Sequence, residues 1–302
     1  MSGESTYADW IAVDWGTSNM RAWAIRDGAV LATGQSDKGM GALAPSEFEA
    51  ALLEVIEPWL GRNRIPLVAC GMVGAKQGWC EAPYAAVPCP PVGRGAVRPE
   101  VSDGRIDVAI LPGLSQGDPA DVMRGEETQI AGYLAKDPDF DGVLCLPGTH
   151  TKWVQISAGE VVSFRTFMTG ELFALISKQS VLRHSVGEGW DAAAFEAAVT
   201  DAMSRPEAMA NRLFTLRAEG LLADLGTGAA TARLSGLLIG AELAAARPYW
   251  LGQKIVLIGA PGLAAHYATA LALQGVSAET ANATDSTLAA LTAAYARLKE
   301  NP

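Results

Sequence analysis

Residues 11–21 read Ile-Ala-Val-Asp-Trp-Gly-Thr-Ser-Asn-Met-Arg, and this segment predicts a strand followed by a tight turn. A short apolar run, typical of a buried strand, leads through Asp14 into a turn made of Gly16, Thr17, Ser18 and Asn19. Glycine lets backbone amides approach a ligand, and the three polar residues add side-chain donors, so the turn suits phosphate. Asp14 then lies where a hydrated Mg²⁺ can be held. Because the same residue types are common in ordinary tight turns, this stretch alone leaves both interpretations open.

A second copy of the pattern lies near the middle of the chain. Residues 143–146 predict a strand that runs into Pro-Gly-Thr-His-Thr-Lys-Trp at 147–153, and a turn at Gly159 leads to a strand over 160–167. The first copy has the same order, with a turn at Gly28 before a strand over 29–34. A repeated supersecondary unit predicts two domains of similar plan that face each other. Chance similarity of two Gly-Thr hairpins is the alternative.

The remaining periodic segments predict an α/β chain. Strands are expected over 66–70, 106–111, 254–258 and 276–280. A capping box at residues 46–49 predicts a helix to about Leu60. Further helices are expected over 124–136, 170–183, 191–204, 207–219, 229–246, 263–274 and 285–299. The proline-rich segment 84–99 is expected to be an extended surface excursion.

Composition restricts the classes of function. The chain has 302 residues, of which 49% are hydrophobic and 19% charged, as in a soluble globular protein with room for two domains. A net charge of −10 argues against nucleic acid and against an anionic membrane as partners, so local Arg and Lys must bind any anionic substrate. The four cysteines lack metal-ligand or disulfide-framework spacing, and residues 1–9 do not resemble a secretion signal. We therefore expect a cytoplasmic protein.

The pattern favours phosphoryl transfer over other nucleotide chemistry. The Walker pattern and the protein-kinase signatures are absent, and no Gly-x-Gly-x-x-Gly follows a strand. The remaining interpretation is a nucleotide held between the two Gly-Thr hairpins. A third glycine turn, at residues 259–262, is then available for the adenosine.

The order of these features resembles the sugar kinase, hexokinase, Hsp70 and actin superfamily. The resemblance implies two similar ribonuclease H-like domains of α/β class, with mixed sheets flanked by helices and the nucleotide in the cleft between them. Residues 1–124 would form a domain that binds the sugar acid and phosphate, and residues 125–302 the nucleotide-binding domain. In carbohydrate kinases of this superfamily, a Gly-Asp opens the helix before the second hairpin, and that Asp is the base. Gly125-Glu126 stands in this place, so we predict that Glu126 is the base, with Glu127 as the less favoured alternative.

Eight motifs in order, between about residues 10 and 295, are similar to the 2-dehydro-3-deoxygalactonokinase family. They lie at residues 14–23, 71–74, 78–79, 82–84, 122–129, 147–154, 168–172 and 234–242. The resemblance implies phosphorylation of the 6-hydroxyl of 2-dehydro-3-deoxy-D-galactonate by ATP with Mg²⁺, in galactonate breakdown. The partner would be a small-molecule sugar acid, and a homodimer is compatible with the sequence. The alternatives are a kinase for an epimeric 2-oxo-3-deoxy acid and a non-catalytic sugar-acid sensor.

Residue roles follow from the chemistry and the resemblance together. The residues expected to bind ATP and its phosphates are Gly16, Thr17, Ser18, Asn19, Gly148, Thr149, His150, Lys152, Gly259 and Ala260. Asp14 is expected to bind the metal, and Met72, Gln77 and Trp79 to line the sugar-acid pocket. Arg21 and Arg124 suit a carboxylate, with a structural ion pair as the alternative for each. For Lys152 the alternative is a solvated lysine on a strand edge.

Other polar and aromatic residues have simpler expected roles. Glu171 is expected to be a helix-start acid stabilised by the helix dipole. His184 and His266 lie in helical patterns and are expected to be packing or surface groups. The tryptophans Trp10, Trp59, Trp190 and Trp250 are expected to be core or interface aromatics.

Overall fold

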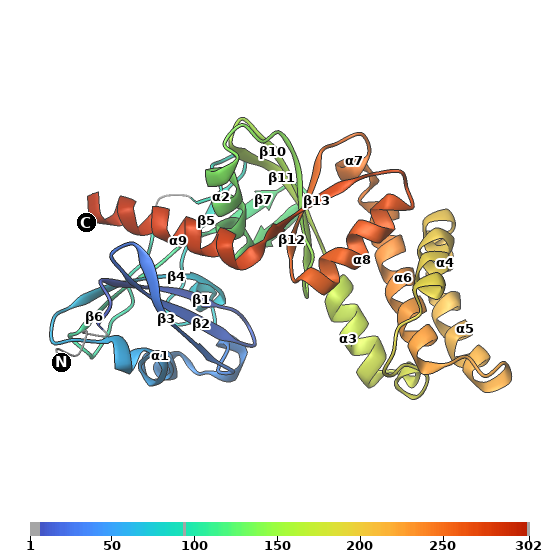
Figure 1. The fold of residues 1–302 in the computed structure, drawn as a ribbon, viewed down its shortest axis with the longest axis horizontal. Helices are drawn as coiled ribbons and strands as arrows, with labels where there is room; N and C mark the ends of the chain where they lie inside the picture. Colours follow the sequence, from blue (N-terminus) through green and yellow to red (C-terminus); the bar gives the residue numbers. More distant parts are fainter. Residues whose placement is uncertain (1–6, 93–94, 301–302) are drawn as a thin grey trace. The chain divides into compact units, whose positions relative to one another are not determined.

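The computed structural model describes residues 7–92 and 95–300, which form two compact units. The first unit contains the chain up to Phe140, residues 158–162 and the chain from Thr284 onward. The second contains residues 141–157 and 163–283. Each unit is built around a five-stranded sheet (Figure 1).

The two sheets have the same plan. The first has the order β3 (Ala29–Ser36), β2 (Met20–Arg26), β1 (Trp10–Trp15), β4 (Ile65–Gly71) and β6 (Ile106–Ile110). The second has the order β11 (Glu160–Phe167), β10 (Thr151–Ser157), β9 (Gly142–Leu146), β12 (Ile255–Gly259) and β13 (Ala278–Asn282). In each sheet the central strand pairs antiparallel with the next strand in the chain and parallel with a later one. The prediction of two similar α/β domains is confirmed, and chance similarity of the hairpins is wrong.

Strand β1 shows why the first sheet is buried on both faces. Its side chains alternate, so that Ile11 and Val13 pack on one face while Trp10 packs on the other. Helix α1 (Phe48–Ile56) covers the Ile11 face. Helix α9 (Ala283–Glu300) covers the opposite face, where Tyr295 stacks on Trp10 with ring centroids 4.5 Å apart (Figure 1).

Helices α2 (Glu126–Lys136) and α9 approach each other closely. A Cβ atom added at Gly132 of α2 would lie 1.7 Å from the carbonyl oxygen of Ser286. Only glycine fits at this contact. The C-terminal helix is therefore packed into the first unit, although it follows the second unit in the chain.

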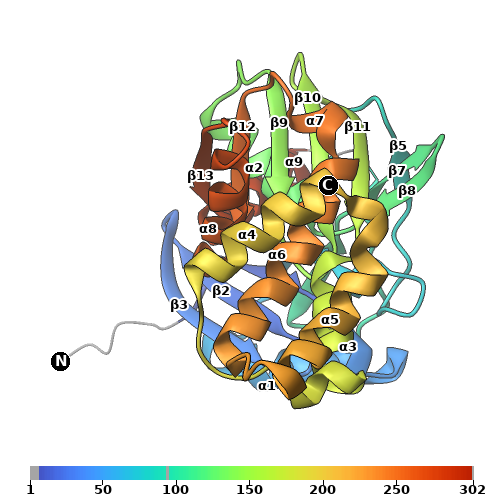
Figure 2. The ribbon, with the colours of Figure 1, turned by 90° about the vertical axis from the view of Figure 1, so that its right-hand side faces the viewer.

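The second unit carries a layer of helices against its sheet (Figure 2). Helix α6 (Thr227–Ala245) is largely buried and contacts α4 (Ala192–Ser204). Cβ atoms added at Gly236 and Gly240 would lie 2.5 and 2.7 Å from backbone oxygens of α4, so glycine permits this close packing. Helix α6 is also contacted by α3 (Thr169–Gln179), α5 (Met209–Leu222), α7 (Arg247–Trp250) and α8 (Pro261–Ala272).

Three features differ from the expectations. A small third sheet of β5 (Tyr84–Ala86), β7 (Gly113–Gly117) and β8 (Ala120–Met123) was not expected. The expected surface excursion over 84–99 agrees with β5, which is extended and largely exposed, but is wrong for Val92, which is buried in the core beside α9; residues 93–94 lie outside the described residues. The expected capping box is also shifted, because the Ala44 amide donates to Glu47 while Glu49 accepts from the amides of Ser102 and Asp103.

The structural units also bear on the expected domain boundary after residue 124. Helix α2 lies in the first unit, which extends to Phe140 and regains the chain at Thr284. The assignment of the sugar acid to one domain and the nucleotide to the other stays a prediction. Of the helices within residues 7–92 and 95–300, none is both long and apolar enough to cross a membrane.

Candidate active site

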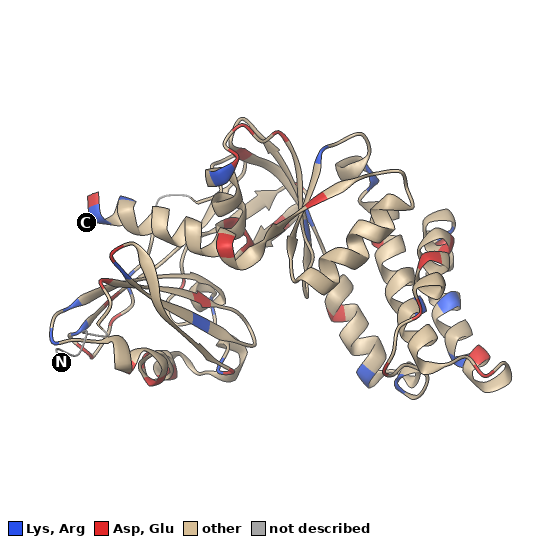
Figure 3. Ribbon diagram, viewed as in Figure 1, with Lys and Arg blue, Asp and Glu red and all other residues tan. Residues whose placement is uncertain are grey.

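Basic and acidic residues are interspersed along the chain in both units (Figure 3). An anionic substrate would therefore have to be bound by individual cations near the predicted sites. Arg21 and Arg124 lie in the first unit, and Lys152 lies in the second.

Asp14 lies at the end of the central strand of the first sheet, where several predicted residues meet. Its partners in register are Arg21 on β2 and Cys70 on β4. Asp14 Oδ2 accepts a hydrogen bond of 2.6 Å from Arg21 Nη2. Gly71, with φ of +91°, keeps the backbone open here, since a Cβ there would lie 2.7 Å from the Trp15 carbonyl oxygen and 3.5 Å from Asp14 Oδ1. Gly125, at the start of α2, lies directly against Gly71.

The guanidinium of Arg21 joins this strand end to the last helix. Its Nη1 donates to Thr284 Oγ1 at 3.0 Å, and its Nη2 makes the bond to Asp14. The predicted metal ligand and one predicted substrate cation thus form an ion pair, which was the alternative for Arg21. Its contact with substrate stays a prediction.

The two glutamates at the start of α2 lie in different environments. Glu127 is 1% exposed, and its carboxylate accepts from the Gly125 amide at 2.6 Å and from Thr128 Oγ1 at 3.2 Å. Burial, with the charge of Glu126 beside it, raises the pKa of Glu127 to about 8. Glu126 is only partly buried and accepts from the Arg124 amide at 3.2 Å. Of the two carboxyls, Glu126 is therefore the more accessible to a ligand.

Arg124 is a buried cation, 7% exposed. Its Nη2 donates to the Ala82 carbonyl at 2.7 Å, and its guanidinium lies 4.2 Å from the centre of the Tyr84 ring. Within the described part of the chain, Nη1 is buried without a hydrogen-bond partner. Gly74 leaves room for it, because a Cβ there would lie 2.9 Å from Nη1. A buried guanidinium in this state favours an anion.

The loop after β4 and the first Gly-Thr turn differ in exposure. Gln77 is exposed and Met72 is half-buried, whereas the Trp79 ring packs against Phe48 and Trp15 in the core. In the turn, the side chains of Thr17, Ser18 and Asn19 are exposed. The turn is closed by the Gly16 amide, which donates to the Asn19 carbonyl at 2.9 Å.

In the second unit, the start of α3 packs directly on the second Gly-Thr turn. The Glu171 amide donates to the Thr149 carbonyl at 2.9 Å, and a Cβ at Gly170 would lie 2.3 Å from the Gly148 carbonyl oxygen. His150 Nε2 lies 2.6 Å from Glu171 Oε2, so Glu171 is both a helix-start acid and a partner of the turn. The turn therefore meets the positive end of a helix dipole.

Lys152 follows this turn on β10. It is 4% exposed, and its Nζ donates to Thr166 Oγ1 at 2.8 Å. The alternative of a solvated lysine is wrong. Its role toward phosphate stays a prediction.

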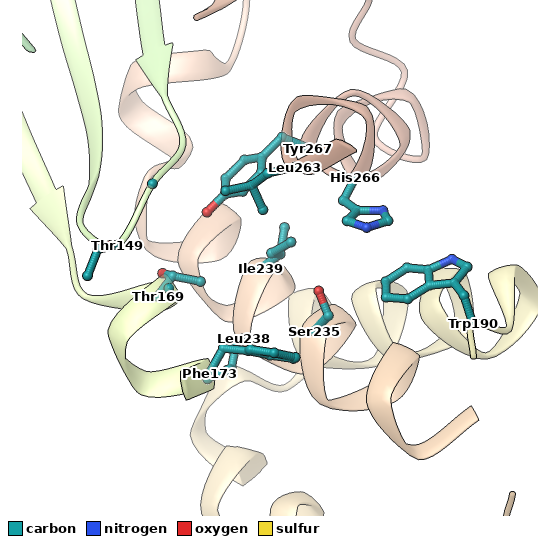
Figure 4. A pocket seen from close by; sticks show the side chains of 12 residues that line it. Thr149, Thr169, Phe173, Trp190, Ser235, Leu238, Ile239, Leu263, His266 and Tyr267 are labelled. Atoms are coloured by element: carbon teal, nitrogen blue, oxygen red, sulfur yellow. The ribbon is translucent and has the colours of Figure 1, made fainter. Parts of the chain in front are cut away.

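A pocket of about 470 Å³ opens beside the second turn. Its wall is formed by Gly148, Thr149, Thr169, Gly170, Phe173, Trp190, Ser235, Leu238, Ile239, Leu263, His266 and Tyr267. Thr149 and Thr169 lie at one side, and Trp190 and His266 lie at the other (Figure 4). The Trp190 and His266 rings stack with centroids 4.1 Å apart, and burial lowers the pKa of His266, which favours its neutral form. The pocket thus has a polar turn at one end and an aromatic wall at the other.

Two expectations about this region need correction. Trp190 is 42% exposed and lines the pocket, so its assignment to the core is wrong, whereas an interface role stays a prediction. His266 lines the pocket as well, which the helical pattern around it did not indicate. Gly259 and Ala260 are not part of the wall, and Gly259 instead lies against Pro147, since a Cβ there would be 3.1 Å from the Pro147 carbonyl oxygen. Their contact with ATP stays a prediction.

Comparisons with known proteins agree with one another. The model of the 2-keto-3-deoxy-galactonokinase family matches residues 14–294. A Rhizobium meliloti (strain 1021) protein named for 2-dehydro-3-deoxygalactonokinase is 42% identical over 301 residues, covering 96% of this chain and 97% of the relative. The 2-dehydro-3-deoxygalactonokinase of Escherichia coli (strain K12) is 38% identical over 272 residues, which cover 89% of this chain and 91% of that relative. A crystal structure titled for the same kinase, from Sinorhizobium meliloti, matches with a TM-score of 0.87 and 39% identity over 95% of this chain and 96% of that chain.

Proposed function

This chain belongs to the 2-keto-3-deoxy-galactonokinase family of carbohydrate kinases, and we propose that it transfers phosphate from ATP to the 6-hydroxyl of 2-dehydro-3-deoxy-D-galactonate. The family and its two-domain α/β fold, of the actin and hexokinase type, support this reaction, which would serve galactonate catabolism. The assignment of ATP, Mg²⁺ and individual residues is our proposal.

The pocket of the second unit is the observation that carries the proposal. Its volume and its largely apolar wall suit a nucleoside, with the base on the aromatic side near Trp190 and His266. The amides of the Gly148 turn and the N-terminus of α3 would then take the phosphates. His150 and Lys152 would add donors at this end.

The first unit supplies one carboxylate toward a metal. Among residues 7–92 and 95–300, no three His, Cys, Asp or Glu side chains gather as a metal site. Mg²⁺ is usually held by one or two carboxylates together with substrate phosphates and water, so Asp14 alone fits such a site. When bound, Mg²⁺ would neutralise charge on the phosphates. The exposed donors of residues 17–19 follow Asp14 closely in the chain and would bind phosphate.

Glu126 is the proposed base for the sugar hydroxyl. A base must be ionised and accessible to the hydroxyl proton. Glu127 meets neither condition, because its raised pKa leaves it mostly protonated at pH 7 and its oxygens face the helix start. Glu126 is partly exposed at the same helix end.

Arg124 is the proposed partner for the carboxylate of the sugar acid. Its buried Nη1 lacks a hydrogen-bond partner within the described residues, and a guanidinium can bind a carboxylate in two parallel bonds. Arg21 already pairs with Asp14, so its contribution would require that pair to rearrange. Met72 and Gln77, near the same strand end, would contact the rest of the sugar acid.

A coupled ADP-release assay tests the reaction. The enzyme is given ATP and Mg²⁺ with a panel of 2-oxo-3-deoxy sugar acids that differ at single hydroxyl positions. We expect the highest kcat/KM with the galactonate-derived acid. A higher value with an epimer would support the epimeric kinase, and binding without turnover on any acid would support a non-catalytic sensor.

A variant of the pocket tests the nucleotide site. Trp190→Ala should raise KM for ATP by about tenfold, because base stacking contributes about 1–3 kcal/mol, while KM for the sugar acid stays unchanged. Phe214→Ala is the matched control, since Phe214 is an exposed aromatic residue of α5 in the same unit and is not part of the pocket wall. Equal KM values for ATP in both variants would contradict the site.

A further inference from the structure

A buried carboxyl lies behind the wall of the nucleotide pocket. Glu242, on α6, is 2% exposed. Its Oε1 accepts from Trp153 Nε1 at 2.8 Å, and its Oε2 accepts from the Tyr267 hydroxyl at 2.8 Å and from the Thr169 hydroxyl. The carboxylate is therefore satisfied by donors from three other elements, β10, α8 and α3.

Helices α3 and α8 line the pocket, and β10 begins directly after its Gly-Thr turn. Thr169 and Tyr267 line the pocket, whereas Glu242 is not part of its wall. Thr151, directly after the turn, hydrogen-bonds to the Tyr267 hydroxyl at 2.9 Å. One carboxyl thus links the start of β10, the first residue of α3 and the middle of α8.

The link through α3 reaches the phosphate turn itself. Thr169 is followed by Gly170, which packs against the Gly148 carbonyl, and the next amide donates to Thr149. A shift of Thr169 would therefore displace the part of α3 that supports the turn. Such packed contacts transmit small displacements because protein interiors have few voids.

We propose that Glu242 is a positioning residue of the nucleotide site, whose carboxylate holds Thr169, Tyr267 and β10 so that the Gly148 turn and the pocket wall bind ATP. The proposal rests on the nucleotide site described under Proposed function. In this proposal, Glu242 does not contact the sugar acid or the reacting atoms. Its effect is on the binding of the nucleotide.

The charge on Glu242 matters because its neighbours are donors. Burial raises its pKa to about 7, against the hydrogen bonds that lower it. The titratable groups that face it are Tyr267 on α8 and Cys145 on β9, whose pKa values burial raises well above their usual ranges. Thr169 on α3 and Trp153 on β10 do not titrate. His150 and Glu171 are further ionisable groups beside the turn, and they pair with each other.

Glu242→Gln tests the charge with little change of shape. Trp153 Nε1 can only donate, so the new amide oxygen must face it, and the amide NH₂ then faces the Thr169 and Tyr267 hydroxyls. All three hydrogen bonds lose their charge assistance, and the two hydroxyls must reverse from donating to accepting. We expect the Kd for ADP, by calorimetry, and KM for ATP to rise about tenfold, with KM for the sugar acid unchanged.

Glu219→Gln is the matched control, because Glu219 pairs with Arg233 of α6 in the same unit and is not part of the pocket wall. It should leave the Kd for ADP unchanged. Unchanged ADP affinity in Glu242→Gln would overturn the inference. Failure of the wild-type enzyme to bind ADP would instead overturn the proposed nucleotide site on which it depends.

The pH profile separates positioning from a purely structural role. KM for ATP in the wild-type enzyme should rise as the pH falls through about 7, because Glu242 becomes protonated, and Glu242→Gln should remove this component. A profile identical in both proteins contradicts the inference. Circular dichroism and the unfolding temperature establish that the variant is folded.

A milder variant keeps the test decisive if Glu242→Gln is unstable. Thr169→Val removes one hydroxyl from the network and should raise KM for ATP in the same direction. If Glu242 acts through Thr169, KM for ATP in the double variant should be no higher than in the single variant with the higher KM. Effects that multiply in the double variant, or an unchanged KM in Thr169→Val, would overturn this route.

Discussion

At the scale of single residues, the neighbouring carboxyls of Glu126 and Glu127 give opposite predictions for catalysis. Glu126→Gln should lower kcat by a factor on the order of 10² to 10⁴, the usual contribution of a general base, and leave KM for ATP nearly unchanged. Glu127→Gln should lower kcat far less, because Glu127 is buried and bonded to the helix start. Steady-state kinetics of both variants decides the assignment. A larger loss of kcat in Glu127→Gln would make Glu127 the base.

Glu127 should also make folding stability depend on pH. Its pKa rises from 4.5 to about 8 on folding, so the folded protein binds more protons than the unfolded chain between these values. Its favourable contribution is full below pH 4.5 and is lost as the pH rises to about 8. The unfolding free energy of Glu127→Gln should therefore fall less than that of the wild type between pH 5 and pH 8, measured by urea titration. Parallel curves for the two proteins would show that Glu127 keeps an ordinary pKa.

Local patterns predicted the residues of the turns and strand ends but not the walls of the pocket. Asp14 and Glu126 stand in motifs that can be recognised within a few positions: Asp14 lies near the end of β1, and Gly125, directly before Glu126, lies against Gly71 at the end of β4. Trp190 and His266 are 76 positions apart, and their stacking depends on how α8 and the start of α4 pack. The hydrogen bonds of Glu242 have the same long-range origin. The hydrophobic periodicity of a single segment does not indicate contacts between side chains that are far apart in the sequence.

At the scale of elements, the contact between α4 and α6 depends on two glycines. Gly236→Ala should destabilise the protein by about 1–3 kcal/mol, because the new Cβ would lie 2.5 Å from the Phe195 carbonyl oxygen. Gly262→Ala in α8 is the matched control, since its Cβ would meet no atom within 4 Å. It should be neutral or stabilising by up to about 1 kcal/mol. Urea midpoints measure both, and equal midpoints would refute the close helix contact.

Elements with clear hydrophobic periodicity were predicted well, and the others were missed. Residues 10–15 form a short apolar run that fills both buried faces of the sheet, so β1 was visible in the sequence. The Gly-Leu-Ser-Gln-Gly of β7 has no such apolar run, and this strand forms because it pairs with β5 and β8. Its formation depends on tertiary pairing, which overrides weak local preference.

At the scale of the whole molecule, the repeat of the Gly-Thr hairpin predicted two equivalent sheets. The strand orders of the two sheets confirm it. The boundary between the units could not be found in the same way, because α2 and α9 join the first unit through contacts with each other. Nothing in the sequence around Gly132 indicates that it packs against Ser286, 154 positions later in the chain. The limits of the two units therefore depend on helix packing, which the hydrophobic pattern of the sequence does not reveal.

The two units should respond differently to parts of the nucleotide, which hydrogen exchange of the full chain can measure. AMP should slow exchange in the second unit, at the Gly148 turn and around His266, because the whole pocket wall lies there. A non-hydrolysable ATP analogue with Mg²⁺ should add protection at residues 14–19 of the first unit, whose donors we assign to the terminal phosphates. The sugar acid alone should protect residues around Arg124 and leave the pocket unchanged. Protection of residues 14–19 by AMP without any in the pocket would contradict this division of roles.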